Sequence, residues 1–271
     1  MKIRAVSAIF AIILIALTTQ FFRAEGLEVF CSIVVLFAIF EYSRLTLTRL
    51  ESPLHIKFTF IALCEALFLS VVWGTPAFSL GFGAIATVIL IAMILMTVRT
   101  ADDLKTILQI QTFAVLGLSY CGVFTGFTVR LLTLPHGEIW FFGLLVLVFS
   151  GDTFAYLAGR AFGKHKLLEP VSPKKTLEGA LGGLVGSALA GLILGLLCFK
   201  EFPLGLIVLM ALITGAFAQV GDLFESLLKR VADVKDSGRI MPGHGGFLDR
   251  LDGVLFAAPI YYALVSFLLS P

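Results

Sequence analysis

Charged residues are scarce in this chain. Asp, Glu, Lys and Arg make up 14% of its 271 residues, while 59% are hydrophobic. A typical soluble domain carries charge on about 25% of its residues. This shortage excludes an ordinary soluble protein. We also expect no nucleic-acid partner, because nucleic-acid binding requires clustered Lys and Arg on an exposed face.

Cysteine is also sparse. Cys31, Cys64, Cys121 and Cys198 are scattered singly through apolar segments, with no CxxC pair and no His at ligand spacing. This arrangement excludes a zinc site and a disulfide framework. We expect the four cysteines to be packing residues.

The chain instead contains a series of continuous apolar runs, each close to the roughly 20 residues that a helix needs to cross a bilayer. Continuous runs favour helices over barrel strands, whose lipid-facing residues alternate with polar ones. We therefore predict an all-α, polytopic integral membrane protein that resides in a lipid bilayer. The nine predicted spans cover residues 5–22, 27–47, 56–73, 77–98, 110–132, 138–159, 178–198, 204–224 and 253–270. We expect the eighth helix to continue past the membrane surface.

The distribution of Lys and Arg predicts an orientation. With the N-terminus in the cytoplasm, nine spans place all but three of the 20 Lys and Arg residues on the cytoplasmic side. The exceptions are Arg23, Arg130 and Lys200. This asymmetry follows the positive-inside rule. It predicts a multi-pass protein of the inner (cytoplasmic) membrane, with a cytoplasmic N-terminus, the C-terminus on the opposite side and an active site at the cytoplasmic face.

The first span has an alternative interpretation. Met1-Lys2-Ile3-Arg4 followed by an apolar run could be a secretory signal peptide, but no small-residue cleavage site precedes Arg23. We therefore expect an uncleaved helix. We divide the chain into residues 1–135, with about five spans, and residues 136–271, with about four spans and a polar motif at residues 222–252.

The polar motif begins on a helix with two distinct faces. At about 100° per residue, its polar side chains fall within an arc of roughly 140°. These are Asp222, Glu225, Ser226, Lys229, Arg230 and Asp233. A solvated face with i,i+4 pairs such as Glu225 with Lys229 is one interpretation. Asp222 directly follows an apolar run, however, and an acidic group at that depth indicates function.

A glycine-rich loop follows this helix. Gly243, Gly245 and Gly246 flank His244, and the amides of such a loop can approach an anion closely. Carboxylates that can hold a hard cation are available nearby at Asp222, Asp249 and Asp252. Basic side chains that can neutralise phosphate oxygens are Lys229, Arg230, Lys235 and Arg250. The combination is typical of metal-assisted phosphoryl or nucleotidyl transfer.

A second polar segment lies upstream. Ser172-Pro173-Lys174-Lys175-Thr176 is expected to open a helix whose free amides, with the two lysines, favour an anion. An ordinary basic flank of a span is the alternative. Asp152 either forms a hydrogen bond between spans or binds substrate or metal. The glycines of residues 179–195 permit close helix packing, within the chain or in a homodimer.

These motifs resemble those of the phosphatidate cytidylyltransferase family, also called CDP-diacylglycerol synthases. The resemblance rests on Ser226-Leu-Leu-Lys229-Arg230, on Lys235-Asp236 and on His244-Gly245-Gly246-Phe-Leu-Asp249-Arg250-Leu-Asp252 at matching spacing. The segments 150–164 and 172–179 also resemble recurring segments of that family. The similarity covers the C-terminal half, and it extends to the N-terminal half by hydropathy.

The resemblance implies transfer of CMP from CTP to phosphatidic acid, giving CDP-diacylglycerol and pyrophosphate. It implies Mg²⁺ as cofactor, with a second, monovalent cation as an addition. The implied metal ligands are Asp222 and Asp249, helped by Asp252 or Glu225. The implied catalytic residues are Ser226, Lys229, Arg230, Lys235, Asp236, His244 and Arg250. The implied substrate-binding residues are Asp152, Lys174, Lys175, Thr176, Gly245 and Gly246.

Other classes of protein share some of these features. A cation or proton-coupled transporter could use Asp152 and Asp222 in an ion path. It would have no need of the Gly-His-Gly-Gly loop and the Asp-Arg-Leu-Asp that follows. Another nucleotide-lipid transferase, such as a CDP-alcohol phosphotransferase or a polyprenyl-phosphate transferase, also uses acidic metal sites. A member of the same family with a different lipid acceptor or nucleotide is a third alternative.

Overall fold

The computed structural model describes residues 25–97, 104–238 and 245–270. Apart from one two-stranded hairpin, the regular structure of these residues is helical. Eight of the described helices are long and apolar enough to cross a membrane. They correspond to the second to ninth predicted spans, and the polytopic membrane fold is confirmed. The first predicted span, at residues 5–22, lies outside the described residues.

The described residues form two compact units. The first unit combines those of residues 1–130 with those of 231–250, and the second combines residues 131–230 with those of 251–271. The segment that follows the eighth span therefore packs with helices of the N-terminal half. Each unit positions its own part of the polar motif.

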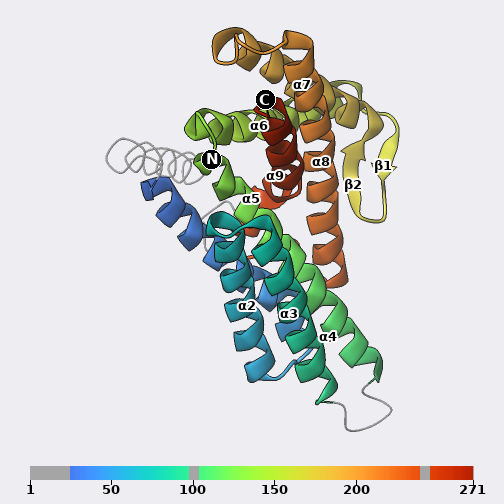
Figure 1. The fold of residues 1–271 in the computed structure, drawn as a ribbon. Coiled ribbons are helices and arrows are strands. Elements are labelled where there is room, and N and C mark those ends of the chain that lie inside the picture. Colours follow the sequence, from blue (N-terminus) through green and yellow to red (C-terminus); the bar gives the residue numbers. More distant parts are fainter. Residues whose placement is uncertain (1–24, 98–103, 239–244, 271) are drawn as a thin grey trace. The chain divides into compact units, whose positions relative to one another are not determined.

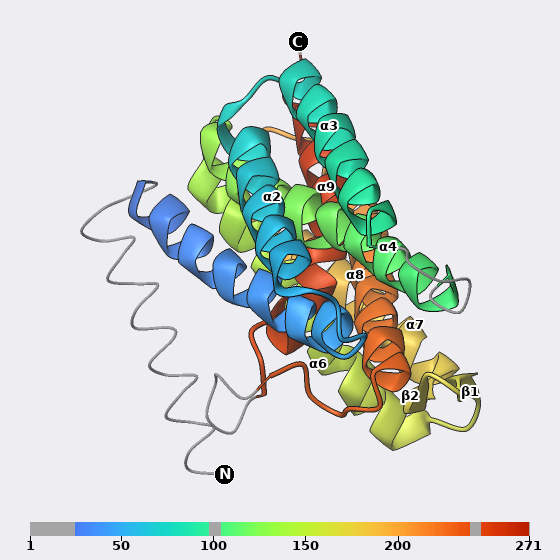
Figure 2. The ribbon, with the colours of Figure 1, turned by 90° about the horizontal axis from the view of Figure 1, so that it is seen from below.

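The helical segments of the first unit are coloured blue to green in Figures 1 and 2. Their bounds are Glu25–Thr48, which ends in the π-helix η1 (Arg44–Thr48), then α2 (Leu54–Trp73), α3 (Pro76–Leu95), α4 (Leu104–Gly117), continued by the π-helix η3 (Leu118–Phe124), and α5 (Thr125–Arg130). Helix α2 packs against α3, η3 and α5.

Small residues allow this close packing. A Cβ atom on Gly126 would lie 2.6 Å from the side chain of Val71, so α5 approaches α2 where only glycine fits. The Arg130 guanidinium donates to the carbonyl oxygens of Val71 and Gly74. These carbonyls lie at the C-terminal end of α2, where unpaired acceptors and the helix dipole favour a cation.

The second unit contains the remaining elements. They are the 3-10 turn η4 (Leu131–Thr133), α6 (Gly137–Phe162), β1 (Lys166–Leu168), β2 (Ser172–Thr176), α7 (Leu177–Leu197), α8 (Leu204–Val231) and, from Leu251 onward, α9 (Leu248–Leu268). Helix α8 continues past residue 224, as predicted. Helix α9 begins earlier than the predicted residue 253, so Asp249 stands in its first turn, where the helix dipole favours a carboxylate.

The glycines of α7 are used for packing within this unit. A Cβ atom on Gly182 would lie 2.3 Å from the Cβ of Ala158 on α6. A Cβ atom on Gly191 would lie 2.3 Å from the Cβ of Ala211 on α8. The Ser187 hydroxyl, on the same helix, donates to the Leu147 carbonyl of α6 over 3.1 Å. Of the two alternatives for these glycines, the structure shows contacts within the chain.

The prediction that residues 172–176 open a helix is wrong. They form β2, which pairs with β1 in antiparallel register, Lys166 opposite Thr176 and Leu168 opposite Ser172. Proline favours an extended conformation in the residue before it, which disfavours a helix at Ser172. Only Thr176 takes part in the helix start, because its hydroxyl accepts from the Gly179 amide as the N-cap of α7.

Candidate functional site

In the second unit, three charged side chains lie close to the Asp222 carboxylate, those of Asp152, Asp252 and Lys175. The Lys175 Nζ, on β2, lies 2.6 Å from Asp222 Oδ2 on α8. Asp152 on α6 and Asp252 on α9 each lie close enough to Asp222 to repel its carboxylate, and Asp152 is attracted by Lys175. Four different elements thus contribute one charged side chain each. We call Asp152, Lys175, Asp222 and Asp252 the carboxylate cluster.

The hairpin holds Lys175 against α8. The Glu178 carboxylate, at the start of α7, accepts from the backbone amides of Lys164 and His165 and so fastens the beginning of the hairpin. At its turn, the Val171 carbonyl accepts from Arg230 Nε over 3.1 Å. The hairpin therefore lies beside α8 (Figure 1). Arg230, predicted to be catalytic, ties the last turn of α8 to it.

Glu225 and Lys229 form the i,i+4 ion pair that the solvated-face interpretation predicts. The pair is not on a solvated face, however, because Glu225 is fully buried. Removing one partner of a buried ion pair costs several kcal/mol, about 3–5 in typical cases. The Glu225 carboxylate is thus engaged by Lys229. Its role as a metal ligand, and the role of half-buried Ser226, remain predictions.

Gly221 brings the backbones of α8 and α9 together beside the cluster. A Cβ atom on Gly221 would lie 2.4 Å from the Asp252 carbonyl oxygen and 2.8 Å from the Phe256 Cβ. Neither neighbour is the far end of a flexible side chain. Any larger residue at position 221 must therefore move α9 away from α8, and with it Asp252 away from Asp222.

We expect Gly221→Ala to lower kcat/KM about tenfold, and to destabilise the fold by roughly the 1–3 kcal/mol typical of overpacking. Gly205→Ala is the matched control, because Gly205 is on the same helix and a Cβ there would meet nothing within 4 Å. Activity and thermal unfolding in detergent measure both variants. If Gly221→Ala and Gly205→Ala had the same kcat/KM and the same unfolding temperature, the close approach of α9 at Gly221 would not determine activity or stability.

In the first unit, Asp249 organises the loop that precedes α9. Its Oδ2 accepts from the Ser237 amide (2.9 Å), the Ser237 hydroxyl (3.0 Å) and the Gly246 amide (2.8 Å). Gly245 has a φ of +86° and leaves no room for a side chain, since its Cβ would lie 2.7 Å from the same Oδ2. The glycines predicted to bind an anion thus also shape the loop around Asp249.

Glu41 is a further residue that contacts this loop, and it was not among the residues predicted from the sequence. Its side chain is buried, and Oε2 accepts from the Leu248 amide over 3.0 Å and lies 3.2 Å from the Ser237 hydroxyl oxygen. Cβ atoms on Gly238 and Gly246 would lie 2.1 and 2.3 Å from this carboxylate. The predicted span 27–47 contains two acidic residues, Glu28 at its start and Glu41 farther inside, and an acidic side chain inside an apolar span is the signal that could have revealed Glu41.

The remaining predicted residues are less constrained. Lys174, Lys235, Asp236 and Arg250 are exposed, and His244 lies outside the described residues. Lys235 and Asp236 line a pocket of the first unit. Thr176, predicted to bind substrate, is engaged as the N-cap of α7.

The donor atoms of the carboxylate cluster suit Mg²⁺. Three carboxylates lie together, with Lys175 paired to Asp222 and Lys229 attracting Asp252, and oxygen ligands are those that Mg²⁺ takes. Within residues 25–97, 104–238 and 245–270, no three His, Cys, Asp or Glu side chains are close enough to hold one metal ion as they stand. Metal binding by these residues therefore remains a prediction.

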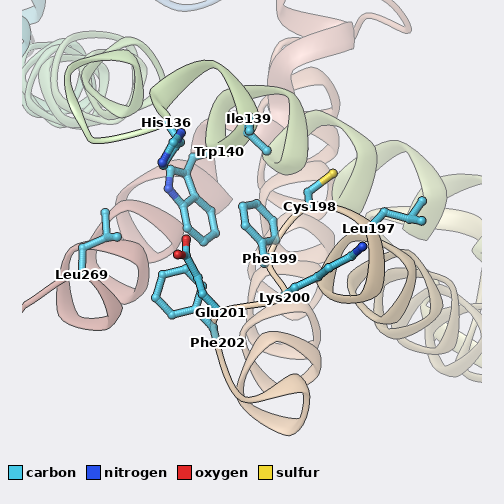
Figure 3. Close-up of a pocket in the computed structure, with 10 residues that line it drawn as sticks. All are labelled: His136, Ile139, Trp140, Leu197, Cys198, Phe199, Lys200, Glu201, Phe202 and Leu269. Carbon is cyan, nitrogen blue, oxygen red and sulfur yellow. The ribbon is translucent and has the colours of Figure 1, made fainter.

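Another pocket of the second unit is remote from the cluster. It is enclosed by the start of α6, the α7–α8 connection and the end of α9, and Trp140 stacks on Phe199 with ring centroids 3.9 Å apart (Figure 3). Trp140 and Asp152 are twelve positions apart on α6, about 18 Å along a helix axis. The wall of this pocket is largely aromatic and aliphatic. We therefore do not assign it to the chemistry of the cluster.

Membrane helices whose ends carry clustered carboxylates, Lys and Arg define a class of protein: an integral membrane enzyme equipped to handle phosphate groups. Comparison with known families makes this specific. A model described as the Cytidylyltransferase family matches residues 2–268, and the chain belongs to that family.

Individual relatives agree with this assignment. The phosphatidate cytidylyltransferase of Staphylococcus haemolyticus (strain JCSC1435) is 33% identical over 98% of this chain and 99% of its own length. That of Bacillus subtilis (strain 168) is 40% identical over 57% of this chain and 58% of its own length. That of Staphylococcus aureus (strain COL) is 41% identical over 56% of this chain and 58% of its own length.

Proposed function

We propose that the protein is a phosphatidate cytidylyltransferase of phospholipid biosynthesis, which transfers CMP from CTP to phosphatidic acid. The observation that carries this proposal is the end-to-end similarity to a phosphatidate cytidylyltransferase, over 98% of this chain. The carboxylate cluster and the Asp249 loop supply the acidic and basic side chains that such a reaction requires. The bilayer supplies the lipid substrate.

In this reaction a phosphate oxygen of phosphatidate attacks the α-phosphorus of CTP. The bond between that phosphorus and the bridging oxygen breaks, and its electron pair leaves with pyrophosphate. Because the attacking phosphate is already ionised near neutral pH, the enzyme needs no covalent nucleophile. Its contribution is positioning and charge neutralisation.

We assign the roles as follows. Asp222 and Asp249 are the proposed metal ligands, with Asp252 or Glu225 assisting, and Asp152 joins them because it shares the cluster of Asp222. Mg²⁺ bound by these carboxylates would neutralise phosphate charge and polarise the reacting phosphorus. A second, monovalent cation is part of the same proposal. Arg230, Lys229 and Arg250 would offset the charge that develops on the leaving pyrophosphate.

We propose the inner membrane as the location, with the N-terminus in the cytoplasm and the C-terminus on the opposite side. The distribution of Lys and Arg supports this orientation. Reporter fusions at the C-terminus measure it. The homodimer also remains a prediction, which light scattering of the purified protein in detergent measures.

The proposed function predicts pyrophosphate release by purified protein in mixed micelles that contain phosphatidic acid, CTP and Mg²⁺. We expect release to require all three components, and to be lost when UTP or ATP replaces CTP or when EDTA is added. Release without phosphatidate would indicate simple hydrolysis. No release from well-folded protein with phosphatidate would argue for a different lipid acceptor or for transport.

A further inference from the structure

A basic pocket lies in the first unit, where the end of the first described helix meets the segment that follows α8. It has a volume of about 430 Å³. The lining residues are Arg44, Leu45, Arg49, Val234, Lys235, Asp236, Ser237 and Gly238. Pockets of about 300–1,000 Å³ accommodate small-molecule ligands. The function assigned above makes no use of Arg44 or Arg49.

The charge around this pocket is unbalanced. Arg44, Arg49 and Lys235 line it with a single carboxylate, that of Asp236. No ion pair among the described residues joins any of the three cations to an acidic side chain. The Arg44 guanidinium lies 6.0 Å from the ring centroid of Phe40, which leaves its hydrogen-bond donors available. The side chains that line the pocket therefore carry a net positive charge.

The π-helix η1 explains why Arg44 and Arg49 can line one pocket. Residues five apart lie about 140° from one another around an α-helix. The wider π turn, in which residue i bonds to residue i+5, reduces this angle, and such turns are frequent at functional sites. Leu45, Thr46 and Leu47, between the two arginines, are buried. The turn is thus anchored in the core while the two arginines remain exposed.

The opposite wall of the pocket is held in place by buried hydrogen bonds. The Ser237 amide donates to Asp249, and its hydroxyl lies within hydrogen-bond distance of both Asp249 and Glu41. Gly238 packs so closely on the Glu41 carboxylate that a Cβ atom would lie 2.1 Å away. Because this wall is fixed before a ligand arrives, little ordering would be required on binding.

We propose that this pocket binds a phosphate group of a substrate, held by Arg44, Arg49 and Lys235. A guanidinium group matches phosphate oxygens with two parallel hydrogen bonds, and three cations against one carboxylate suit a ligand with more than one negative charge. The identity of the substrate rests on the proposed function. Two sources offer this chemistry, the triphosphate of CTP and the head group of phosphatidate, and the experiment below distinguishes them.

The first test is kinetic. In Arg44→Gln/Arg49→Gln we expect KM for one substrate to rise at least tenfold, while KM for the other substrate and kcat stay within about twofold. A rise for CTP identifies the nucleotide as the source of the phosphate, and a rise for phosphatidate identifies the lipid. Lys105→Gln, an exposed cation of α4 outside the pocket, is the matched control and should leave both KM values unchanged.

The second test measures binding without turnover. Purified full-length protein in micelles is titrated with CTP and Mg²⁺, and separately with short-chain phosphatidate. The double Gln variant should lose at least tenfold in affinity for one of them, and Arg44→Lys/Arg49→Lys should recover part of the loss because it restores the charge. Unchanged affinity for both ligands in a monodisperse double Gln variant would overturn the pocket proposal.

The two tests separate this inference from the proposed function. A wild-type protein that releases no pyrophosphate, but whose affinity for either ligand falls in the double Gln variant, would disprove the proposed function and support the pocket. The opposite result is an active wild-type protein whose double Gln variant has the same affinities and the same two KM values. It would support the proposed function and disprove the pocket.

Discussion

Asp222→Asn is expected to lower kcat/KM at least about 100-fold. The loss of a single group that stabilises charge in the transition state typically has an effect of this size. The substitution keeps the size of the side chain but removes one charge from the carboxylate cluster, and it weakens the contact with Lys175, 2.6 Å away. Pyrophosphate release at several Mg²⁺ concentrations measures the effect. If Asp222 helps to bind the metal, the half-saturating Mg²⁺ concentration should also rise.

Asp233→Asn is the matched control for this change. Asp233 is exposed and has a φ of +48°, a left-handed conformation that Asn adopts as readily as Asp. We expect its kcat/KM to stay within about twofold of the wild type. Wild-type activity in Asp222→Asn would instead remove Asp222 from the reaction.

Glu41→Leu is expected to lower kcat/KM about 30-fold and to reduce thermal stability, although Glu41 is 196 residues from Ser237 in the chain. Leucine fills the same buried space but accepts no hydrogen bond. The Leu248 amide would then lack its acceptor, while the Ser237 hydroxyl, which has one proton to donate, would keep the Asp249 carboxylate as its acceptor. Each buried polar group left unpaired costs about 1–3 kcal/mol.

Glu41→Gln separates a positioning role from a general loss of stability. Its amide oxygen can accept from the same donors, so we expect most of the activity to return. Hydrogen exchange of the peptide that contains Leu248 should be faster in the Leu variant and close to wild type in the Gln variant. Full activity in Glu41→Leu would show that the Asp249 loop does not depend on this carboxylate.

The membrane helices could be predicted from the sequence because hydropathy is a local property. An apolar run long enough to span a bilayer forms a helix whatever surrounds it, since lipid offers the backbone no other hydrogen-bond partner. The predicted span 56–73 lies within α2, Leu54–Trp73. The helix ends were less well predicted, since α9 begins at Leu248 rather than at residue 253.

The hairpin could not be predicted in the same way. Ser172, Pro173, Lys174 and Lys175 have low strand propensity, and two lysines beside a span are equally typical of a basic flank. Their pairing with β1 is established by contacts, among them the bond from Arg230 to the Val171 carbonyl, 59 residues away in the chain. Such contacts leave no trace in the local sequence.

The sequence predicted the residues of the carboxylate cluster, but it did not predict which of their side chains contact one another. Asp152, Lys175, Asp222 and Asp252 were each candidates, yet the sequence gives no reason to pair Lys175 with Asp222 in particular. The contributions of Glu41, of Arg44 on η1 and of Arg49 directly after it were harder to foresee. Their neighbours at Ser237 and Lys235 are almost 200 residues away, and the resemblance in the N-terminal half rests on hydropathy.

Following the α-phosphorus of CTP shows whether CMP is transferred to the lipid. Wild-type protein in micelles with phosphatidate and Mg²⁺ is supplied with CTP labelled at the α-phosphorus and, in a parallel reaction, at the γ-phosphorus. We predict that the α label enters the lipid as CDP-diacylglycerol, while the γ label is released as pyrophosphate in equal amount. If the α label stays in the aqueous phase while CTP is consumed, transfer of CMP to the lipid is contradicted.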